Sequence, residues 1–380
     1  MARAPDDIPD ALLRLSLCPE VGPAFLHDSL AAFGSHEAVL SASDAALRSL
    51  PRMGAGRTAA LRAALASVDG ARERARMRAC GIRALVLGDE DYPPLLAPVP
   101  RPPWLLWTRG GTEAARCDAV AVVGSRRPTA YGRSQAARFA GEAAGAGIAV
   151  VSGGARGIDA EAHRAALRAG GATVAVLGCG LANPYPPEHA ALFEEIVGSG
   201  GLVVSEFPCD WPPLPSNFPR RNRIVSGLSL AVLVVEAARA SGALITARIA
   251  VDDHGRQACA VPGPVDSPRS AGCNLAIREG WVEPVLSPED LVAAVHASSE
   301  RTGRPAAGST DGQGGAVPAA LEPLVEAVVA ALRRSPGASL DDLASVVPAA
   351  AGRIAALRTL AELALAGAPP ALGGQVQPIA

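Results

Sequence analysis

The sequence contains no lysine, so all 35 of its basic residues are arginines. This absence excludes three kinds of site that depend on lysine: the phosphate-binding loop of P-loop NTPases, a Schiff-base site and a lysine general base. The planar guanidinium of arginine matches the geometry of phosphate and stacks on flat rings. Any anion site in this chain must therefore be built from arginine.

Aromatic residues, paired cysteines and long apolar runs are also scarce. Aromatics make up 3% of the chain, so alanine, valine and leucine must fill the cores. The seven cysteines include no C-x-x-C pair, which argues against a disulfide framework and a structural zinc site. No run of about 18 uncharged apolar residues is present, and the N-terminus lacks an apolar signal core. We therefore expect a cytoplasmic protein without a membrane partner.

The net charge of −2 does not indicate a nucleic-acid-binding protein, so an anion site must be a local cluster. One cluster stands out in NFPRRNRIVSGLS, residues 217–229, where Arg220, Arg221 and Arg223 follow Phe218. Arginine is rarely buried unpaired, so either nearby acids neutralise these side chains or an anion binds there. Phe218 either stacks on a base or packs in the core, and both interpretations stay open.

The composition divides the chain into four regions. Residues 1–78 predict a helical domain of the helix-hairpin-helix or SAM-like kind, whose glycine turns either pack or contact phosphate. Residues 80–298 predict a Rossmann-like domain, because apolar runs such as AVAVVGS, IAVVSGG and TVAVLGC alternate with alanine-rich helical stretches. The expected fold is α/β, with a doubly wound, mostly parallel sheet. Residues 299–318 read as a linker and residues 319–380 as a winged-helix-like domain.

In such a sheet, ligands bind beyond the carboxyl ends of the strands, so the strand-to-helix turns are candidate sites. Two of these turns combine glycine with arginine, and glycine lets backbone N–H groups gather around an anion. They contain Gly124, Ser125, Arg126 and Arg127 in the first turn, and Ser152, Gly153, Gly154, Arg156 and Gly157 in the second. Arg248, in SGALITAR, either joins this site or pairs with an acid to tie the sheet together.

Other motifs point away from a cofactor or a catalytic centre. No G-x-G-x-x-G fingerprint is present, which disfavours nicotinamide and flavin cofactors, and no G-x-S-x-G nucleophile turn is present. Asp159 and His163 stand four residues apart and suit an acid–base or metal pair. We favour the alternative in which Asp159 caps a helix and His163 faces a neighbouring helix, because no third ligand is visible. We expect no cofactor and no metal.

Several of these stretches resemble, in order, the motifs of the DNA-processing protein A family (DprA, also called Smf). They are VAVVGSRRPTAYG, VVSGGARGIDAEAH, AVLGCGLANPYPPEH, SEFP, NFPRRNRIVSGLS, VVEA with SGALITAR, and AVPGPVDSPRSAGCNLAIREG. The resemblance covers about residues 85–295. Trp281 departs from it, because a small residue usually follows REG in the family.

The resemblance implies a homodimer that binds and protects single-stranded DNA and passes it to a RecA-type recombinase during natural transformation, without catalytic turnover. Carried over, the family's DNA pocket falls on Gly124, Ser125, Arg126, Phe218, Arg221, Asn222 and Arg223, together with Ser152, Gly153, Gly154, Arg156 and Gly157. The first glycine turn, the arginine cluster and SGALITAR add Arg127, Arg220 and Arg248, respectively, as further candidates. On this hypothesis the arginines lack acidic partners because their counterion is the phosphate backbone.

Two other classes of function compete with this one. A nucleotide-processing enzyme of the phosphoribohydrolase kind uses a similar fold, but its PGGxGTxxE motif is absent here. A pure interaction scaffold would recruit partners through its helical ends and leave the central pocket without a ligand.

Overall fold

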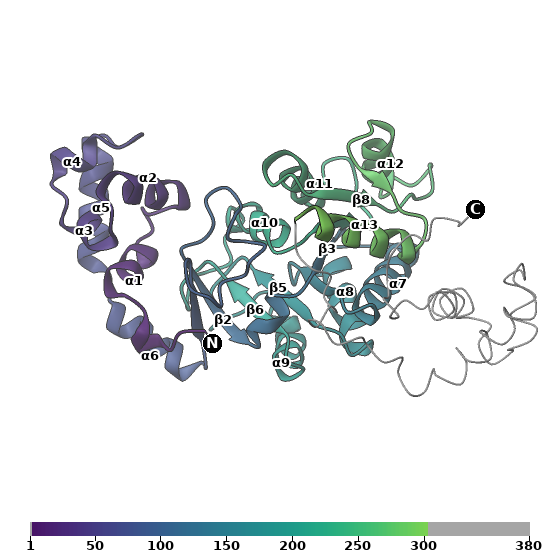
Figure 1. Ribbon diagram of the computed structural model, residues 1–380, viewed down its shortest axis with the longest axis horizontal. Coiled ribbons are helices and arrows are strands. Elements are labelled where there is room, and N and C mark those ends of the chain that lie inside the picture. Colours follow the sequence, from purple (N-terminus) through teal and green to yellow (C-terminus); the bar gives the residue numbers. More distant parts are fainter. Residues whose placement is uncertain (1, 303–380) are drawn as a thin grey trace, which may run out of the picture. The chain divides into compact units, whose positions relative to one another are not determined.

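The alternating strands and helices of the middle region form one nine-stranded sheet (Figure 1). The computed structural model describes residues 2–302, and the predicted winged-helix-like region and most of the predicted linker lie outside these residues. The strand order is β1-β2-β6-β5-β4-β3-β7-β8-β9, and the strands from β6 to β9 in this order are parallel. This confirms the Rossmann-like, mostly parallel sheet.

The strand bounds follow the predicted apolar runs closely. They are β1 (Arg83–Val86), β2 (Leu105–Gly110), β3 (Ala119–Val123), β4 (Ala149–Ser152), β5 (Thr173–Leu177), β6 (Leu202–Ser205), β7 (Ala231–Val234), β8 (Gln257–Ala260) and β9 (Glu283–Pro284). The sequence analysis missed β2 and β9. It also placed the β1 run among the parallel strands, whereas β1 and β2 pair antiparallel, and β2 pairs antiparallel with β6. Parallel neighbours need a crossover helix, and the segment between β1 and β2 forms none.

Helices cover both faces of the sheet. They are α7 (Ala130–Gly145), α8 (Ile158–Arg168), α9 (Ala190–Gly198), α10 (Asn217–Gly227), α11 (Gly242–Arg248), α12 (Ala271–Arg278) and α13 (Pro288–Arg301). Side chains alternate along β3, so Val120 and Val122 pack with α7, α8 and α13, while Ala121 and Val123 face the core that α10, α11 and α12 cover. The sheet is therefore doubly wound, as predicted.

The direction of winding reverses at β3. From β3 the chain proceeds through β4 and β5 to β6, each strand lying beside the one before. It then returns through α10 to β7, which pairs with the other edge of β3 (Figure 1). Such a topological switch point opens a crevice at the carboxyl ends of the two strands. The predicted glycine turns follow β3 and β4, so they lie at or beside this crevice.

Six helices precede the sheet in the described residues: α1 (Asp10–Leu17), α2 (Pro23–Phe33), α3 (His36–Ser41), α4 (Asp44–Arg48), α5 (Ala55–Ser67) and α6 (Gly70–Ala79). Leu12, Leu13 and Leu15 of α1 share a hydrophobic core with Trp107 of β2. Glu73 of α6 also accepts a hydrogen bond from the backbone of Cys209, after β6, at 2.8 Å. These helices and the sheet belong to one compact unit, and the division at residues 78–80 stays a prediction.

All seven cysteines lie in the described part of the chain and form no disulfide; five of them are buried. This agrees with their interpretation as small core residues. No helix among the described residues is long and apolar enough to cross a membrane.

His163 of α8 is fully buried and faces β5 rather than the neighbouring helix that we expected. Its Nδ1 lies 2.8 Å from the hydroxyl of Thr173, which itself donates to the carbonyl of Val150. Nδ1 must therefore carry the proton, and Nε2 has no hydrogen-bond partner. Burial lowers the pKa of His163 to about 3, so the ring stays neutral at physiological pH.

The lowered pKa of His163 predicts that acid weakens the fold. Below the ordinary histidine pKa of about 6.5 the unfolded chain takes up a proton that the folded chain refuses, so the free energy of unfolding falls toward pH 3. Between pH 6 and pH 4, His163→Gln should remove a slope of about 1.4 kcal/mol per pH unit. Urea denaturation across this range tests it, with His296→Gln, a substitution at an exposed position, as the control. An unaltered slope in His163→Gln would contradict the buried neutral ring.

Candidate nucleic-acid interface

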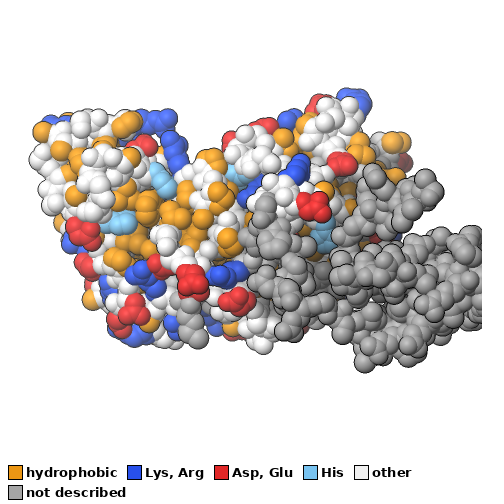
Figure 2. Space-filling model, viewed as in Figure 1, with side chains coloured by type: hydrophobic (Ala, Val, Ile, Leu, Met, Phe, Trp, Pro, Cys, Tyr) orange, Lys and Arg blue, Asp and Glu red, His pale blue; other side chains and the backbone are white. Residues whose placement is uncertain are grey.

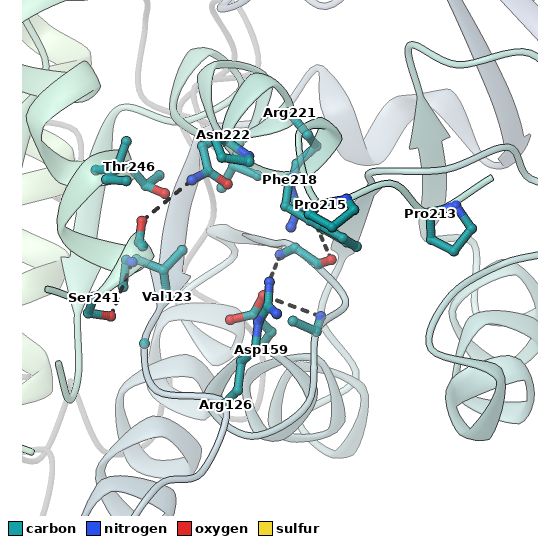
Figure 3. Close-up of a pocket in the computed structure, with 18 of the residues that line it drawn as sticks. Val123, Arg126, Asp159, Pro213, Pro215, Phe218, Arg221, Asn222, Ser241 and Thr246 are labelled. Atoms are coloured by element: carbon teal, nitrogen blue, oxygen red, sulfur yellow. Dashed lines mark hydrogen bonds between the residues drawn. The ribbon is translucent and has the colours of Figure 1, made fainter. Parts of the chain in front are cut away.

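A pocket of about 570 Å³ opens at the switch point. We call it the switch-point pocket. Its walls come from the turns after β3 and β4, from α10 and from the start of α11. Figure 3 shows Arg126 and Asp159 on one side of it, with Phe218, Arg221 and Asn222 of α10 on the opposite side. Ser241 and Thr246, from the segment after β7, form a third wall.

The arginine-rich stretch forms α10, and helical spacing places two of its arginines on one face of the helix and the third on another. Pro219 is tolerated because it lies in the first turn, where a backbone N–H has no partner within the helix. Arg220 and Arg223 stand three residues apart and therefore share one face. Arg221 points to another side and is buried, with 4% of its surface exposed.

Arg220 and Arg223 both pair with Glu206, which follows β6. The Nε of Arg220 lies 3.1 Å from one carboxylate oxygen of Glu206, and Arg223 binds the other oxygen. The expectation that these two arginines lack acidic partners was therefore wrong. The pairing arises because the two arginines share one helix face, which brings both guanidinium groups to one carboxylate. Neither side chain lines the switch-point pocket.

Arg221 holds the second glycine turn against α10. Its guanidinium donates to the carbonyls of Gly153 and Val176, at the ends of β4 and β5. Burial lowers the pKa of Arg221 to about 10, and the nearby carboxylate of Asp159 opposes this shift. Asp159 in turn accepts the backbone N–H groups of Gly153 and Ala155 at 3.1 and 3.3 Å. Asp159 thus closes the turn before α8. It is structural, but it does not cap the helix as we expected, because Gly157 holds the N-cap position and Asp159 lies within the first turn.

Arg126 presents an exposed guanidinium to the pocket. Its central carbon lies 5.2 Å from the centroid of the Phe218 ring, which is a cation–π contact. Tyr185 lies beside Phe218 with ring centroids 6.0 Å apart, and Arg156 lies 5.4 Å from the Tyr185 centroid. Within the described residues Arg126 forms no ion pair. The pocket therefore combines a free cation with an aromatic surface.

The glycines of the two turns serve close packing. Gly157 has φ +81°, and a Cβ there would lie 2.3 Å from the carbonyl oxygen of Ser125. The amide of Ile158 donates to this same carbonyl at 3.1 Å, so the turns after β3 and β4 are in direct contact. Ser152 is buried and its hydroxyl donates to Val122, and Gly154 packs beneath Phe193. These residues shape the turns without lining the pocket.

The structure brings six of the predicted residues into the pocket lining: Gly124, Arg126, Gly153, Phe218, Arg221 and Asn222. Arg156 pairs with Glu188 at the rim. Arg248 lies in a different hollow. Its guanidinium stacks on the ring of Trp281, 3.7 Å from the centroid, and forms an ion pair with Glu279 at 3.9 Å. Arg248 therefore takes the structural alternative, and its ring partner is Trp281, the residue that departs from the family pattern. That the pocket residues contact DNA stays a prediction at this point.

Sequence reasoning missed Tyr185, Ser241 and Thr246 as pocket residues. Tyr185 lies in the third strand-end turn, LGCGLANPYPPEHA, which lacks the combination of glycine and arginine. An aromatic residue in a turn of this kind was the available signal. No group of acidic, histidine or cysteine side chains with metal-ligand geometry occurs in residues 2–302.

The profile of a family described as DNA recombination-mediator protein A matches residues 83–296. Protein Smf of Escherichia coli is 46% identical over 203 residues, which are 53% of this chain and 54% of that protein. The DNA processing protein DprA of Bacillus subtilis is 35% identical over 57% of this chain and 72% of that protein. The chain spans about half the length of the E. coli relative.

Two solved structures share the fold. DNA processing protein A of Streptococcus pneumoniae has 30% identity and a TM-score of 0.65, covering 75% of this chain and 98% of that chain. The Helicobacter pylori protein, described for its single-stranded DNA binding mode, has 28% identity and a TM-score of 0.51, covering 57% and 96%.

The packing around Gly153 yields a stability prediction. In Gly153→Ala a Cβ would lie 2.5 Å from the guanidinium nitrogens of Arg221 and 2.6 Å from the carboxylate of Asp159. Neither buried group has room to move, so overpacking should lower the free energy of unfolding by about 1–3 kcal/mol. Gly141→Ala in α7, with no atom within 4 Å, is the control and should raise it by about 0.5–1 kcal/mol. Equal urea midpoints for the two variants would refute the crowding.

Proposed function

Because this chain belongs to the DNA recombination-mediator protein A family, we propose that it binds single-stranded DNA in the switch-point pocket. One observation carries the proposal: the exposed guanidinium of Arg126 lies over the ring of Phe218, at the mouth of a pocket where backbone turns meet. A single strand offers both a phosphate for the cation and an unstacked base for the ring. A duplex keeps its bases paired and stacked.

Each wall of the pocket has a role in this binding. Phe218 and its neighbour Tyr185 form the stacking surface for a base. Arg126 neutralises a phosphate. The Asn222 side chain donates to the carbonyl of Gly242 on the third wall at 3.4 Å (Figure 3), and its amide oxygen contacts a base or a sugar. Arg221 acts through the turn that it holds, so it is a positioning residue. Ser241 and Thr246 offer hydroxyl groups on the third wall.

The role that we propose is binding without chemistry. Asp159 is the carboxylate that lines the pocket, and it accepts two backbone N–H groups while facing the charge of Arg221. A carboxylate held in this way closes a turn and is poorly placed to take a proton from a substrate. This weakens the phosphoribohydrolase-like alternative, in which a nucleotide would be cleaved at the same pocket.

The family supplies the rest of the proposal. We propose that the chain acts in the cytoplasm as a homodimer, protects incoming single strands and loads a RecA-type recombinase onto them during natural transformation. The S. pneumoniae structure, matched over 98% of its length, supports this assignment for the Rossmann-like region. We also propose that residues 1–78, 80–298 and 319–380 act as helical, DNA-binding and winged-helix-like domains, with residues 299–318 as the linker between the last two.

Two substitutions separate the phosphate contact from the stacking contact. Arg126→Ala should remove one phosphate contact and reduce the slope of log K against log salt by about 0.7. Phe218→Ala should weaken binding by about 1–3 kcal/mol and leave the slope unchanged, because stacking releases no counterion. Arg168→Ala, an exposed arginine at the end of α8, is the control. Fluorescence anisotropy with a dT oligonucleotide measures both quantities. Wild-type affinity in both pocket variants would refute the assigned pocket.

The mediator role has its own test. On a single strand already covered by single-strand binding protein, the wild-type chain should speed filament assembly by a RecA-type recombinase, followed as ATP hydrolysis. Arg126→Ala should lose this stimulation, since delivery requires the strand to be held, whereas Arg168→Ala should keep it. Normal strand binding without stimulation would overturn recombinase loading and leave DNA binding intact.

A further inference from the structure

A second hollow adjoins the switch-point pocket, and arginine dominates its lining. It measures about 450 Å³ and is lined by Arg126, Arg127, Arg133, Arg164 and Arg269, with Glu161 as its acid. We call it the arginine hollow. Resting on the function proposed above, we propose that the arginine hollow binds consecutive phosphates of the same single strand after it leaves the switch-point pocket.

The charge of this hollow is gathered from four separate parts of the chain. Arg126 and Arg127 come from the turn after β3, Arg133 from α7, Arg164 from α8 and Arg269 from the loop before α12. A chain with a net charge of −2 thus brings five cations together around one acid. On the face seen in Figure 2, by contrast, basic and acidic side chains are scattered among one another. Cations held this close together repel one another unless an anion binds among them.

Ion pairs inside the protein leave most of this charge available. Arg164 lies 3.7 Å from Glu161 and forms an ion pair with it, so the one acid of the hollow neutralises Arg164. Arg127, Arg133 and Arg269 are exposed and form no ion pair with another described residue. The side chain of Arg133 donates to the backbone carbonyl of Pro128, which fixes its position without neutralising it. Together with Arg126, which also has no ion pair among the described residues, four cations therefore remain for an external anion.

The lining favours phosphates over bases. Its one ring is the imidazole of His189, which is buried and bonded through Nδ1 to the carbonyl of Gly154 at 3.0 Å. A base would find no open aromatic surface there, in contrast to Phe218 in the switch-point pocket. Gly157, the N-cap residue of α8, also lines the hollow, so the positive end of this 11-residue helix adds to the field. This is the chemistry of a backbone contact without sequence preference.

Arg126 connects the two sites, because it lines both of them. A strand whose base lies on Phe218 has its phosphate beside Arg126, and the next phosphates continue into the arginine hollow. The hollow thus extends the binding site beyond one or two nucleotides. Arg133 and Arg269 become phosphate contacts that the sequence analysis did not single out.

The test compares two double variants of the full chain. Arg133→Gln with Arg269→Gln removes two exposed charges from the hollow, and Arg138→Gln with Arg168→Gln removes two exposed charges outside it. Salt dependence is measured by anisotropy with dT oligonucleotides of increasing length, starting from a dinucleotide. With long oligonucleotides the hollow variant should lose about 1.4 from the slope of log K against log salt, at about 0.7 per phosphate. With the shortest oligonucleotide that binds, its slope should equal that of the wild type. The control pair should match the wild type at every length.

Each other outcome has a distinct meaning. A slope that is unchanged at all lengths, or reduced equally at all lengths, would overturn the hollow as an extension while the switch-point pocket stands. Failure of the wild-type chain to bind any single strand would refute the proposed function itself. Equal melting temperatures of the two double variants confirm that both fold.

Discussion

The buried guanidinium of Arg221 is the interaction on which the site depends. A cation removed from water is costly, and it is retained only where hydrogen bonds and an opposite charge compensate it. Here the compensation comes from the carbonyls of Gly153 and Val176 and from the field of Asp159. These partners belong to the ends of two strands and the start of α8. One side chain therefore fixes α10 against the turns, and the spacing between them defines the pocket.

The arginines of α10 illustrate how the chain divides structural from available charge. Arg221 is committed to the strand ends, and Arg220 and Arg223 are committed to Glu206. The free cations come from elsewhere, from the turn after β3, from α7 and from the loop before α12. Density of arginine along the sequence is thus a poor guide to where an anion binds. What matters is whether a side chain already has an acid beside it in space.

Local pattern predicted much of the architecture, and long-range pairing accounts for what it missed. Seven apolar runs became strands because their residues suit burial on both faces, and the glycine turns fell at strand ends as parallel topology requires. The partnership of Arg220 with Glu206 spans 14 residues and a strand-to-helix connection, so no local period reveals it. The same holds for the antiparallel pairing of β1 with β2 and for His163, whose partner lies on a strand. Tyr185 was overlooked because proline and glycine dominate its turn.

The shared carboxylate of Glu206 has one further consequence. Two guanidinium groups pair with one carboxylate there, so the N-terminal part of α10 keeps an excess of one positive charge even with both ion pairs intact. Neither arginine lines the switch-point pocket, yet the field of this charge reaches about 10 Å into solvent at 0.1 M salt. If the proposed function holds, we expect its effect to be kinetic: it would draw a polyanion toward the crevice and raise the rate of encounter, while other groups would set the lifetime of the complex.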